Sequence, residues 1–392
     1  MIRKSRTWPA AAACMVLGLA LTACGTTEDE PEATEEDTAA SSGDGGSGST
    51  AACDLKFAFL GPQTGDYANL GINISNGANV ALEEFKAANP DCEITMEIFD
   101  SQGDPEKATP LATQIINDDS IIGVVGPTFS GETDATGAAF AESGLVTVSA
   151  SATNPDLSKQ GWDTFHRLLG NDATQAPAAA KYIQDTLSAK EVFVVDDASE
   201  YGKYIADGVA DELGDLVIDR DTVQQKQTDF SATVTKVKAS GADTLWYGGY
   251  YAEAGLLVKQ LRAGGWEGMF VSGDGSNDPG FVEAAGASAA QDSRLTCPCG
   301  PASEKFVADY KKINNAEPGT YSAEGYDAAN VLLDGFAAGS DTREKMLDFV
   351  NNYEKTGMTK DIKFDETGEV AEVVIYAFKV EDGKIVLDQE IK

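Results

Sequence analysis

Three polar residues stand where apolar runs end, and their side chains carry complementary chemistry. Ser130 follows the apolar run 121–125, and Thr153 follows the run 145–148. A hydroxyl together with the free N–H groups at a helix start favours an anion, so we expect Ser130 and Thr153 to hold one carboxylate. Asp274 follows the run 269–271 and can pair with an ammonium, in charged hydrogen bonds that contribute roughly 1.5–3 kcal/mol each. This combination is typical of a recognition site.

Three tyrosines, Tyr201, Tyr250 and Tyr321, supply apolar walls for such a site. Each polar or aromatic residue has a structural explanation when it is taken alone: a capping Ser or Thr, a turn Asp, a packed Tyr. For Ser130 in isolation the capping role is the simpler interpretation. Only the joint pattern favours a binding site.

The elements that must position these residues alternate between strand-like and helix-like patterns. The first half contains apolar runs at 55–60, 94–99, 121–125 and 145–148, separated by helical patterns at 71–88, 105–118 and 134–142. This alternation predicts parallel sheets covered by helices, an α/β fold whose ligands bind beyond the carboxyl ends of the strands.

The same alternation restarts after residue 164, which predicts a second α/β lobe. About 340 residues follow Ala52, which is more than a single-domain hydrophobic core usually contains. The helices predicted after Pro301 have few strands of their own to cover, so we expect them to return to the first lobe. The predicted lobes, joined by a hinge of several strands, are 54–171 with 301–365 and 172–300 with 366–392.

The N-terminus has the parts of an export signal that ends at a cysteine. Arg3, Lys4 and Arg6 precede an apolar stretch from Ala10 to Leu21, which is too short to cross a bilayer. The following Leu21-Thr22-Ala23-Cys24 resembles the bacterial lipobox, which implies a signal over 1–23 and a lipid on Cys24. Residues 24–52 are acidic and rich in Gly and Ser, so we expect a disordered tether that holds an extracytoplasmic body near the membrane.

Charge and cysteine usage restrict the partners. With 29 basic against 64 acidic residues, nucleic acid is excluded as an expected partner, because phosphate binding needs clustered Lys and Arg. Cys53 and Cys92 each begin a predicted strand, and neighbouring parallel strands would bring them together in a disulfide. Cys297 and Cys299 either close a small ring or remain free thiols. Zinc needs four ligands, and the cysteines offer no second Cys/His pair, so no metal is expected.

Several motifs in combination indicate a family. They are Gly126 to Ser130, Ser149 to Leu157, Ala178 to Ile183, Glu200 to Gly202, Asp229 to Ser231 and Trp246 to Tyr250. From Leu55 to about Lys384, the chain resembles the branched-chain amino-acid-binding proteins of ABC importers, which have the type I periplasmic-binding fold. The resemblance implies a monomer without a cofactor that captures an amino acid between closing lobes and delivers it to a membrane permease.

The resemblance also implies roles for individual residues. Ser130 and Thr153 match positions that bind the α-carboxylate, Ser151 one whose carbonyl helps to bind the α-ammonium, and Asp274 the acid that completes the ammonium site. Tyr201, Tyr250, Gly275 and Tyr321 match positions around the ligand side chain. The chain departs from the pattern at Leu70, where a tyrosine is common, at Phe129, where a smaller residue is common, and at Asp274, which is shorter than the usual Glu.

Three other functions fit parts of the sequence. A serine hydrolase with Ser130 as nucleophile would need a base, and the only histidine, His166, lies in an alternating strand where a structural role is the simpler interpretation. We therefore expect no enzyme activity. A ligand-presenting subunit for a separate signalling receptor is a stronger alternative than the hydrolase. A binder of an amide or another amino-acid-like ligand is the remaining alternative.

Overall fold

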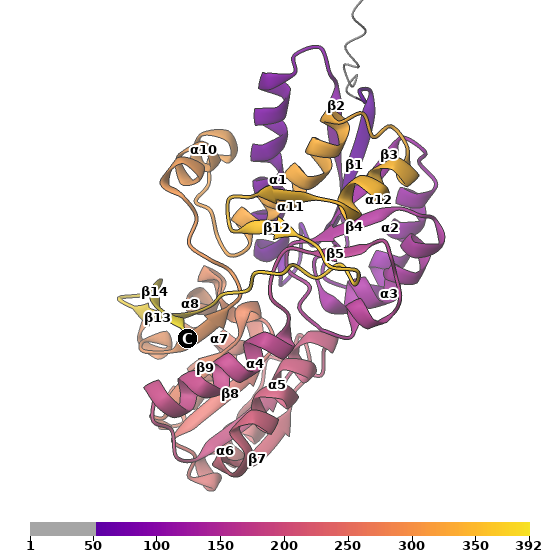
Figure 1. Cartoon of the computed structure of the whole chain (residues 1–392). Helices are drawn as coiled ribbons and strands as arrows, with labels where there is room; N and C mark the ends of the chain where they lie inside the picture. The colour runs from indigo at the N-terminus through magenta and orange to yellow at the C-terminus, as the bar shows by residue number, and fades with distance from the viewer. Residues whose placement is uncertain (1–51) are drawn as a thin grey trace, which may run out of the picture. The chain divides into compact units, whose positions relative to one another are not determined.

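Two β-sheets organise residues 52–392, the part of the chain that the computed structural model describes (Figure 1). The first sheet is wholly parallel, and β1, β3 and β4 carry long buried runs, as expected for strands with helices on both faces. Its strands, in spatial order, are β2 (Ile94–Asp100), β1 (Leu55–Gly61), β3 (Ile121–Val125), β4 (Val146–Ser149) and β5 (Phe165–Arg167).

The second sheet is parallel except at one edge, where β13 and β14 form an antiparallel hairpin. Its strands, in spatial order, are β14 (Lys384–Ile391), β13 (Ile375–Glu381), β10 (Arg294–Cys297), β9 (Met269–Ser272), β8 (Thr244–Gly248), β6 (Val192–Asp196) and β7 (Val217–Thr222). A separate hairpin consists of β11 (Glu354–Thr356) and β12 (Asp361–Lys363). Together the two main sheets confirm the predicted α/β class.

Helices connect the strands and cover the sheets. Those of the first sheet include α1 (Ala68–Ala88), α2 (Pro105–Ile116) and α3 (Ser130–Glu142). Those of the second sheet are α4 (Asp172–Lys181), α5 (Glu200–Leu213), α6 (Ser231–Ser240), α7 (Tyr251–Ala263), α8 (Pro279–Ala285) and α9 (Ala287–Ala290). The predicted start of α3 at Asp134 was wrong, because the helix begins one turn earlier, at Ser130.

The last helices return to the first sheet, as the sequence predicted. They are α10 (Glu304–Asn314), α11 (Ser322–Ala337) and α12 (Arg343–Asn351). Helix α11 packs along α1 and against β3, and α12 packs against β3 and β4. Figure 1 shows these orange helices among the indigo elements of the first sheet. The chain therefore passes between the sheets three times, after β5, after β10 and before β13.

Two disulfides link the described cysteines. The predicted Cys53–Cys92 bond is confirmed, and its cause is the parallel register of β1 and β2, which pairs Leu55 with Ile94. Cys297 and Cys299, for which the sequence left two possibilities, are also bonded to each other. They mark the end of β10, a strand that the sequence analysis missed.

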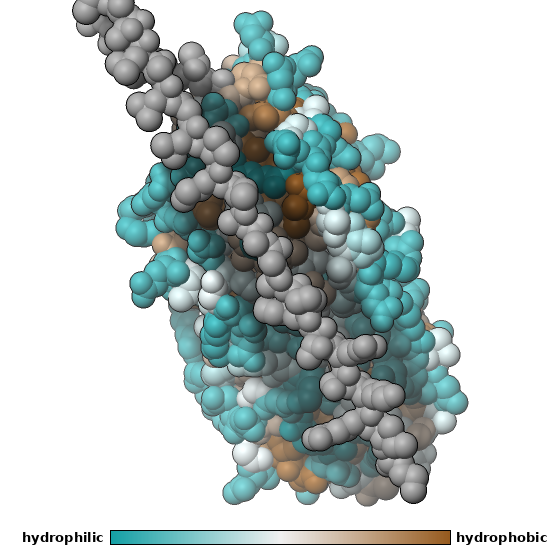
Figure 2. Space-filling model, turned by 90° about the vertical axis from the view of Figure 1, so that its right-hand side faces the viewer, coloured by the Kyte–Doolittle hydropathy of each residue, from teal (hydrophilic) through white to brown (hydrophobic). Residues whose placement is uncertain are grey.

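The N-terminal predictions, including the signal and Cys24, lie outside the described residues. Ala52, predicted as the last tether residue, is instead buried, and its N–H donates to the carbonyl of Phe336. Between residues 52 and 392, no helix is long and apolar enough to cross a membrane. The face in Figure 2 is mostly hydrophilic. The exposed large apolar side chains Ile98, Ile218 and Leu387 lie on the edge strands β2, β7 and β14.

Candidate functional site

Loops at the carboxyl ends of strands from both sheets surround a small cavity. The space left in it is about 10 Å³, room for about one water molecule. Its lining residues are Leu70, Phe129, Ser130, Ser151, Tyr201, Tyr250, Asp274, Gly275 and Tyr321. All of them were predicted as ligand-binding residues. Thr153, the remaining predicted residue, does not line the cavity but is buried in the same loop as Ser151. An amino acid can enter only if some of these side chains move.

Hydroxyl groups and a helix start form one side of the cavity. Ser130 is the first residue of α3 and not its cap, since Phe129 holds the cap position and its N–H donates to Glu132. The Ser130 hydroxyl accepts from the N–H of Asn154 at 3.2 Å, which fixes the loop after β4 against α3. The Thr153 hydroxyl oxygen is buried and has no hydrogen-bond partner. This side of the site is suited to an anion such as a carboxylate.

Arg167, which the sequence analysis did not single out, holds this loop in place. Its guanidinium is buried and donates to the carbonyls of Ala152 at 2.8 Å and Asn154 at 3.0 Å, the two residues that flank Thr153. Glu369, on the third passage between the sheets, pairs with Arg167 at 2.6 Å. Arg167 is thus a positioning residue. The sign of this role in the sequence was a charged residue within the predicted strand 164–168.

Asp274 lines the cavity opposite these hydroxyl groups, and a second buried carboxyl, Asp172, lies behind the lining. Asp274 accepts from the Tyr201 hydroxyl at 2.9 Å and from the Tyr321 hydroxyl, and burial raises its pKa. Asp172, the first residue of α4, was missed by the sequence analysis. It is wholly buried, and burial together with the charge of Asp274 raises its pKa well above the usual value, although the Thr153 hydroxyl beside it acts to lower that pKa. Two desolvated acids side by side attract a cation.

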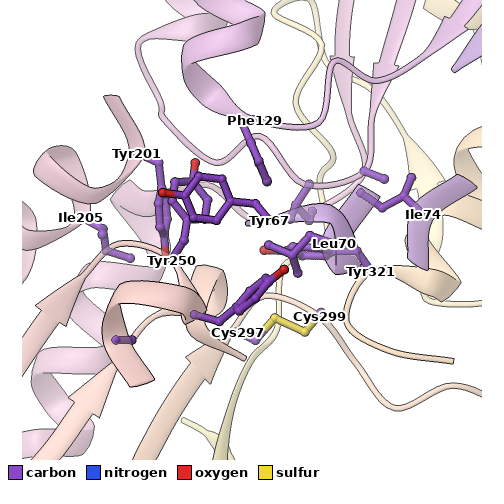
Figure 3. Close-up of a cluster of buried hydrophobic side chains, with 14 of the residues drawn as sticks. Tyr67, Leu70, Ile74, Phe129, Tyr201, Ile205, Tyr250, Cys297, Cys299 and Tyr321 are labelled. Atoms are coloured by element: carbon purple, nitrogen blue, oxygen red, sulfur yellow. A yellow bond between two sulfur atoms is a disulfide. The ribbon is translucent and has the colours of Figure 1, made fainter. Parts of the chain in front are cut away.

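Aromatic rings make the apolar wall, and one of them was not predicted. Tyr250 lies 4.7 Å from Phe129, 5.3 Å from Tyr201 and 4.9 Å from Tyr67, centroid to centroid (Figure 3). Tyr67 lies one residue before α1 and therefore supplies a ring near Leu70. The family resemblance places a tyrosine at the Leu70 position, and the sequence analysis did not single out Tyr67 as the residue that supplies the ring instead. Gly275 has to be glycine here, because a Cβ would lie 2.7 Å from Cε1 of Tyr201.

Side chains of the first sheet's loops also bond to the second sheet's helices. The Tyr67 hydroxyl donates to Glu253 of α7 at 2.8 Å, and Asn69 donates to Asp278 at 2.8 Å. Asn154 donates to the carbonyl of Glu200 at 3.1 Å. These contacts close the loops over the cavity from both sides.

Comparison with known proteins decides the family. The model of the periplasmic binding proteins matches residues 54–384. The chain belongs to the periplasmic binding protein family. Among its relatives, the Leu/Ile/Val-binding protein BraC3 of Rhizobium johnstonii is 30% identical over 345 residues, covering 85% of this chain and 93% of the relative. The leucine-specific-binding protein of Salmonella typhimurium is 29% identical over 330 residues, covering 81% and 88%.

Solved structures of similar proteins agree with this assignment. The leucine-binding protein LivK of Thermotoga maritima has a TM-score of 0.78 and 27% identity, covering 86% of this chain and 98% of LivK. LivJ of Streptococcus pneumoniae, in complex with isoleucine, has a TM-score of 0.80 and 28% identity, covering 86% and 99%. The predicted family and fold are confirmed.

This periplasmic binding protein buries further acids around its cavity. Burial raises the pKa of Glu132 and of Asp197 to about 7. Each keeps one carboxyl oxygen without a hydrogen-bond partner. Over residues 52–392, no group of three or more His, Cys, Asp or Glu side chains is placed to hold a metal ion. The sole histidine, His166, contacts Asn351 at 2.9 Å and lies outside the cavity.

Proposed function

We propose that this protein captures an α-amino acid, branched-chain or similar in its side chain, and delivers it to the permease of an ABC importer. One observation supports the proposal: the first residue of a helix, Ser130, and the desolvated carboxyl of Asp274 line the same aromatic-walled cavity. That pairing suits a ligand with a carboxylate at one end and an ammonium beside it. The amino acids named for the relatives have this head group.

In the proposed binding mode, Ser130 and Thr153 hold the carboxylate. Asp274, Asp172 and the carbonyl of Ser151 hold the ammonium. The aromatic residues and Leu70 enclose the side chain. Because Ser130, Ser151 and Thr153 belong to loops of the first sheet and Asp274 to a loop of the second, the ligand binds the closed form better than an open one and shifts the population toward it. The permease then recognises the closed form.

We also propose that Cys24 carries a lipid that anchors the protein outside the cytoplasmic membrane, and that the lobes have the boundaries predicted from the sequence. An anchored binder works at high effective concentration beside its permease. Metabolic labelling with a fatty acid tests this part, since labelling that survives a Cys24→Ala substitution would exclude that residue as the lipid site.

Ligand identification and calorimetry test the binding function. Mass spectrometry of small molecules released from denatured protein is expected to find an amino acid. Ser130→Ala and Asp274→Asn are each expected to weaken its binding at least tenfold, about 1.4 kcal/mol. Asp134→Asn, at an exposed position of the same helix as Ser130, is the matched control. Unchanged affinity in both site variants would contradict the assignment.

A further inference from the structure

A second and larger pocket adjoins Tyr321, and we propose that it takes the distal end of a long amino-acid side chain tipped with N–H donors. The pocket measures about 580 Å³, within the usual range of small-molecule sites. Tyr321 lines both this pocket and the small cavity, so its side chain is part of the wall between them. This inference rests on the proposed function, because the head group of the same ligand would occupy the small cavity.

The lining of this side pocket suits an aliphatic stem with a donor at its end. Val282 of α8, Val307 of α10 and Ile385 of β14 supply apolar surface. Asn277 and Glu324 supply the polar part: both are buried, and Asn277 Oδ1 and Glu324 Oε1 have no hydrogen-bond partner. Since both orphaned atoms are acceptors, the complementary group is a donor such as an amide or ammonium N–H.

Neighbouring contacts leave these acceptors free for a ligand. The Asn277 amide nitrogen donates to Cys299 Sγ at 3.7 Å, so the amide already has a partner on its donor side. Burial raises the pKa of Glu324 to about 7, although the positive charge of Lys360 acts to lower it. The lining residues Glu317 and Lys384 are respectively exposed acidic and exposed basic groups, and they add no net charge to the pocket.

Tyr321 is held in an unfavourable backbone conformation at this wall. Its φ is 69°, in the left-handed region that a bulky residue occupies at a cost of roughly 1–3 kcal/mol. Its hydroxyl donates to Asp274, and the neighbouring Thr320 hydroxyl donates to the carbonyl of Asn277. Figure 3 shows Tyr321 near Leu70 and the Cys297–Cys299 disulfide.

The head group of the ligand provides a reason for Tyr321 to move. In the proposed binding mode the ammonium bonds to the same Asp274 carboxylate that accepts from the Tyr321 hydroxyl, and crowding at that carboxylate favours rotation of the Tyr321 side chain. A rotated Tyr321 side chain opens the wall between the cavity and the side pocket. Binding of the head group thereby admits a longer side chain.

Calorimetry with ligands of matched length tests the inference on the full chain. L-norleucine has a straight apolar side chain, L-lysine adds an ammonium at its tip, and L-glutamine ends in an amide. We expect L-lysine or L-glutamine to bind at least tenfold more tightly than L-norleucine. In Asn277→Leu and Glu324→Gln this ratio is expected to fall several-fold, whereas Glu304→Gln, at an exposed position on α10, is expected to keep it.

The outcomes separate this inference from the proposed function. If L-leucine binds the wild-type protein but neither donor-tipped ligand exceeds L-norleucine, the side-pocket inference is wrong and the proposed function stands. A preference that survives both pocket variants, with melting temperatures showing that they fold, also overturns the inference. If no amino acid binds the wild-type protein, the proposed function itself fails.

Discussion

Replacing Asp172 with asparagine is expected to weaken ligand binding and to stabilise the ligand-free protein at the same time. Asp172 is buried with neither carboxyl oxygen bonded, next to Asp274. A charged hydrogen bond to a ligand ammonium contributes about 1.5–3 kcal/mol, so Asp172→Asn is expected to reduce affinity about 10- to 150-fold. Without ligand, the same carboxylate is an unsatisfied buried group that costs about 1–3 kcal/mol, which the neutral amide relieves in part.

The sign of the pH dependence follows from the raised pKa of Asp172. A carboxyl with a raised folded-state pKa contributes stability that is fully present below its unfolded pKa and is lost as the pH rises through the folded value. The gain in melting temperature of Asp172→Asn, a few degrees, is therefore expected at pH 8 and should shrink at pH 5.

Differential scanning calorimetry without ligand and isothermal titration calorimetry with ligand measure the two effects. Asp134→Asn, exposed on α3, makes the same chemical change without burial and is the matched control. A lower ligand-free melting temperature at pH 8, or an affinity equal to that of the wild type, would refute the reasoning that this buried acid is reserved for a cation.

Three further predictions follow from other contacts. Arg167→Met is expected to lower the free energy of unfolding by about 3–5 kcal/mol, measured by urea unfolding, because it breaks a buried ion pair. Tyr67→Phe removes the hydroxyl that donates to Glu253 and should weaken ligand affinity through a less stable closed form, and equal affinity would exclude that contact as a latch. Because burial raises the pKa of Glu132 and Asp197 to about 7, the melting temperature is expected to fall between pH 5.5 and 8, and Glu132→Gln should reduce that fall.

The sequence predicted the sheets and the loops around the cavity because both leave local signals. Buried parallel strands read as apolar runs, and loops at their carboxyl ends carry the polar residues. Ser130, Asp274 and Tyr250 could be found in this way. The strand β10, Arg294–Cys297, was missed because its apolar residues Leu295 and Cys297 are separated by Thr296 and follow a charged Arg294, so it shows no apolar run.

What the sequence could not give are the contacts made between distant segments. Asp172 and Arg167 belong to the site only because the loop after β5 folds back on the loop after β4, where the N–H of Asp172 donates to the carbonyl of Thr153 at 2.9 Å. Tyr67 belongs to the aromatic wall because of the turn before α1. The tyrosine ring that the family has at the Leu70 position is therefore supplied from three positions earlier in the chain. Neither the contact between the two loops nor the position of the Tyr67 ring alters the pattern of apolar and polar residues along the chain, and that pattern is what the prediction from a single sequence uses.

The unpaired acids explain why closure should depend on the ligand. Asp274 accepts hydrogen bonds from the hydroxyls of Tyr201 and Tyr321, and the buried Asp172 carboxyl has no charged partner among the described residues that satisfies both of its oxygens. An ammonium that bonds to the Asp274 carboxylate is expected to contribute about 1.5–3 kcal/mol in a charged hydrogen bond. Shifting a two-state equilibrium from 1:99 to 99:1 requires about 5.5 kcal/mol of preferential binding. We therefore expect the head group to supply part of the free energy that closure needs, and the contacts of the side chain with the aromatic wall to supply the rest.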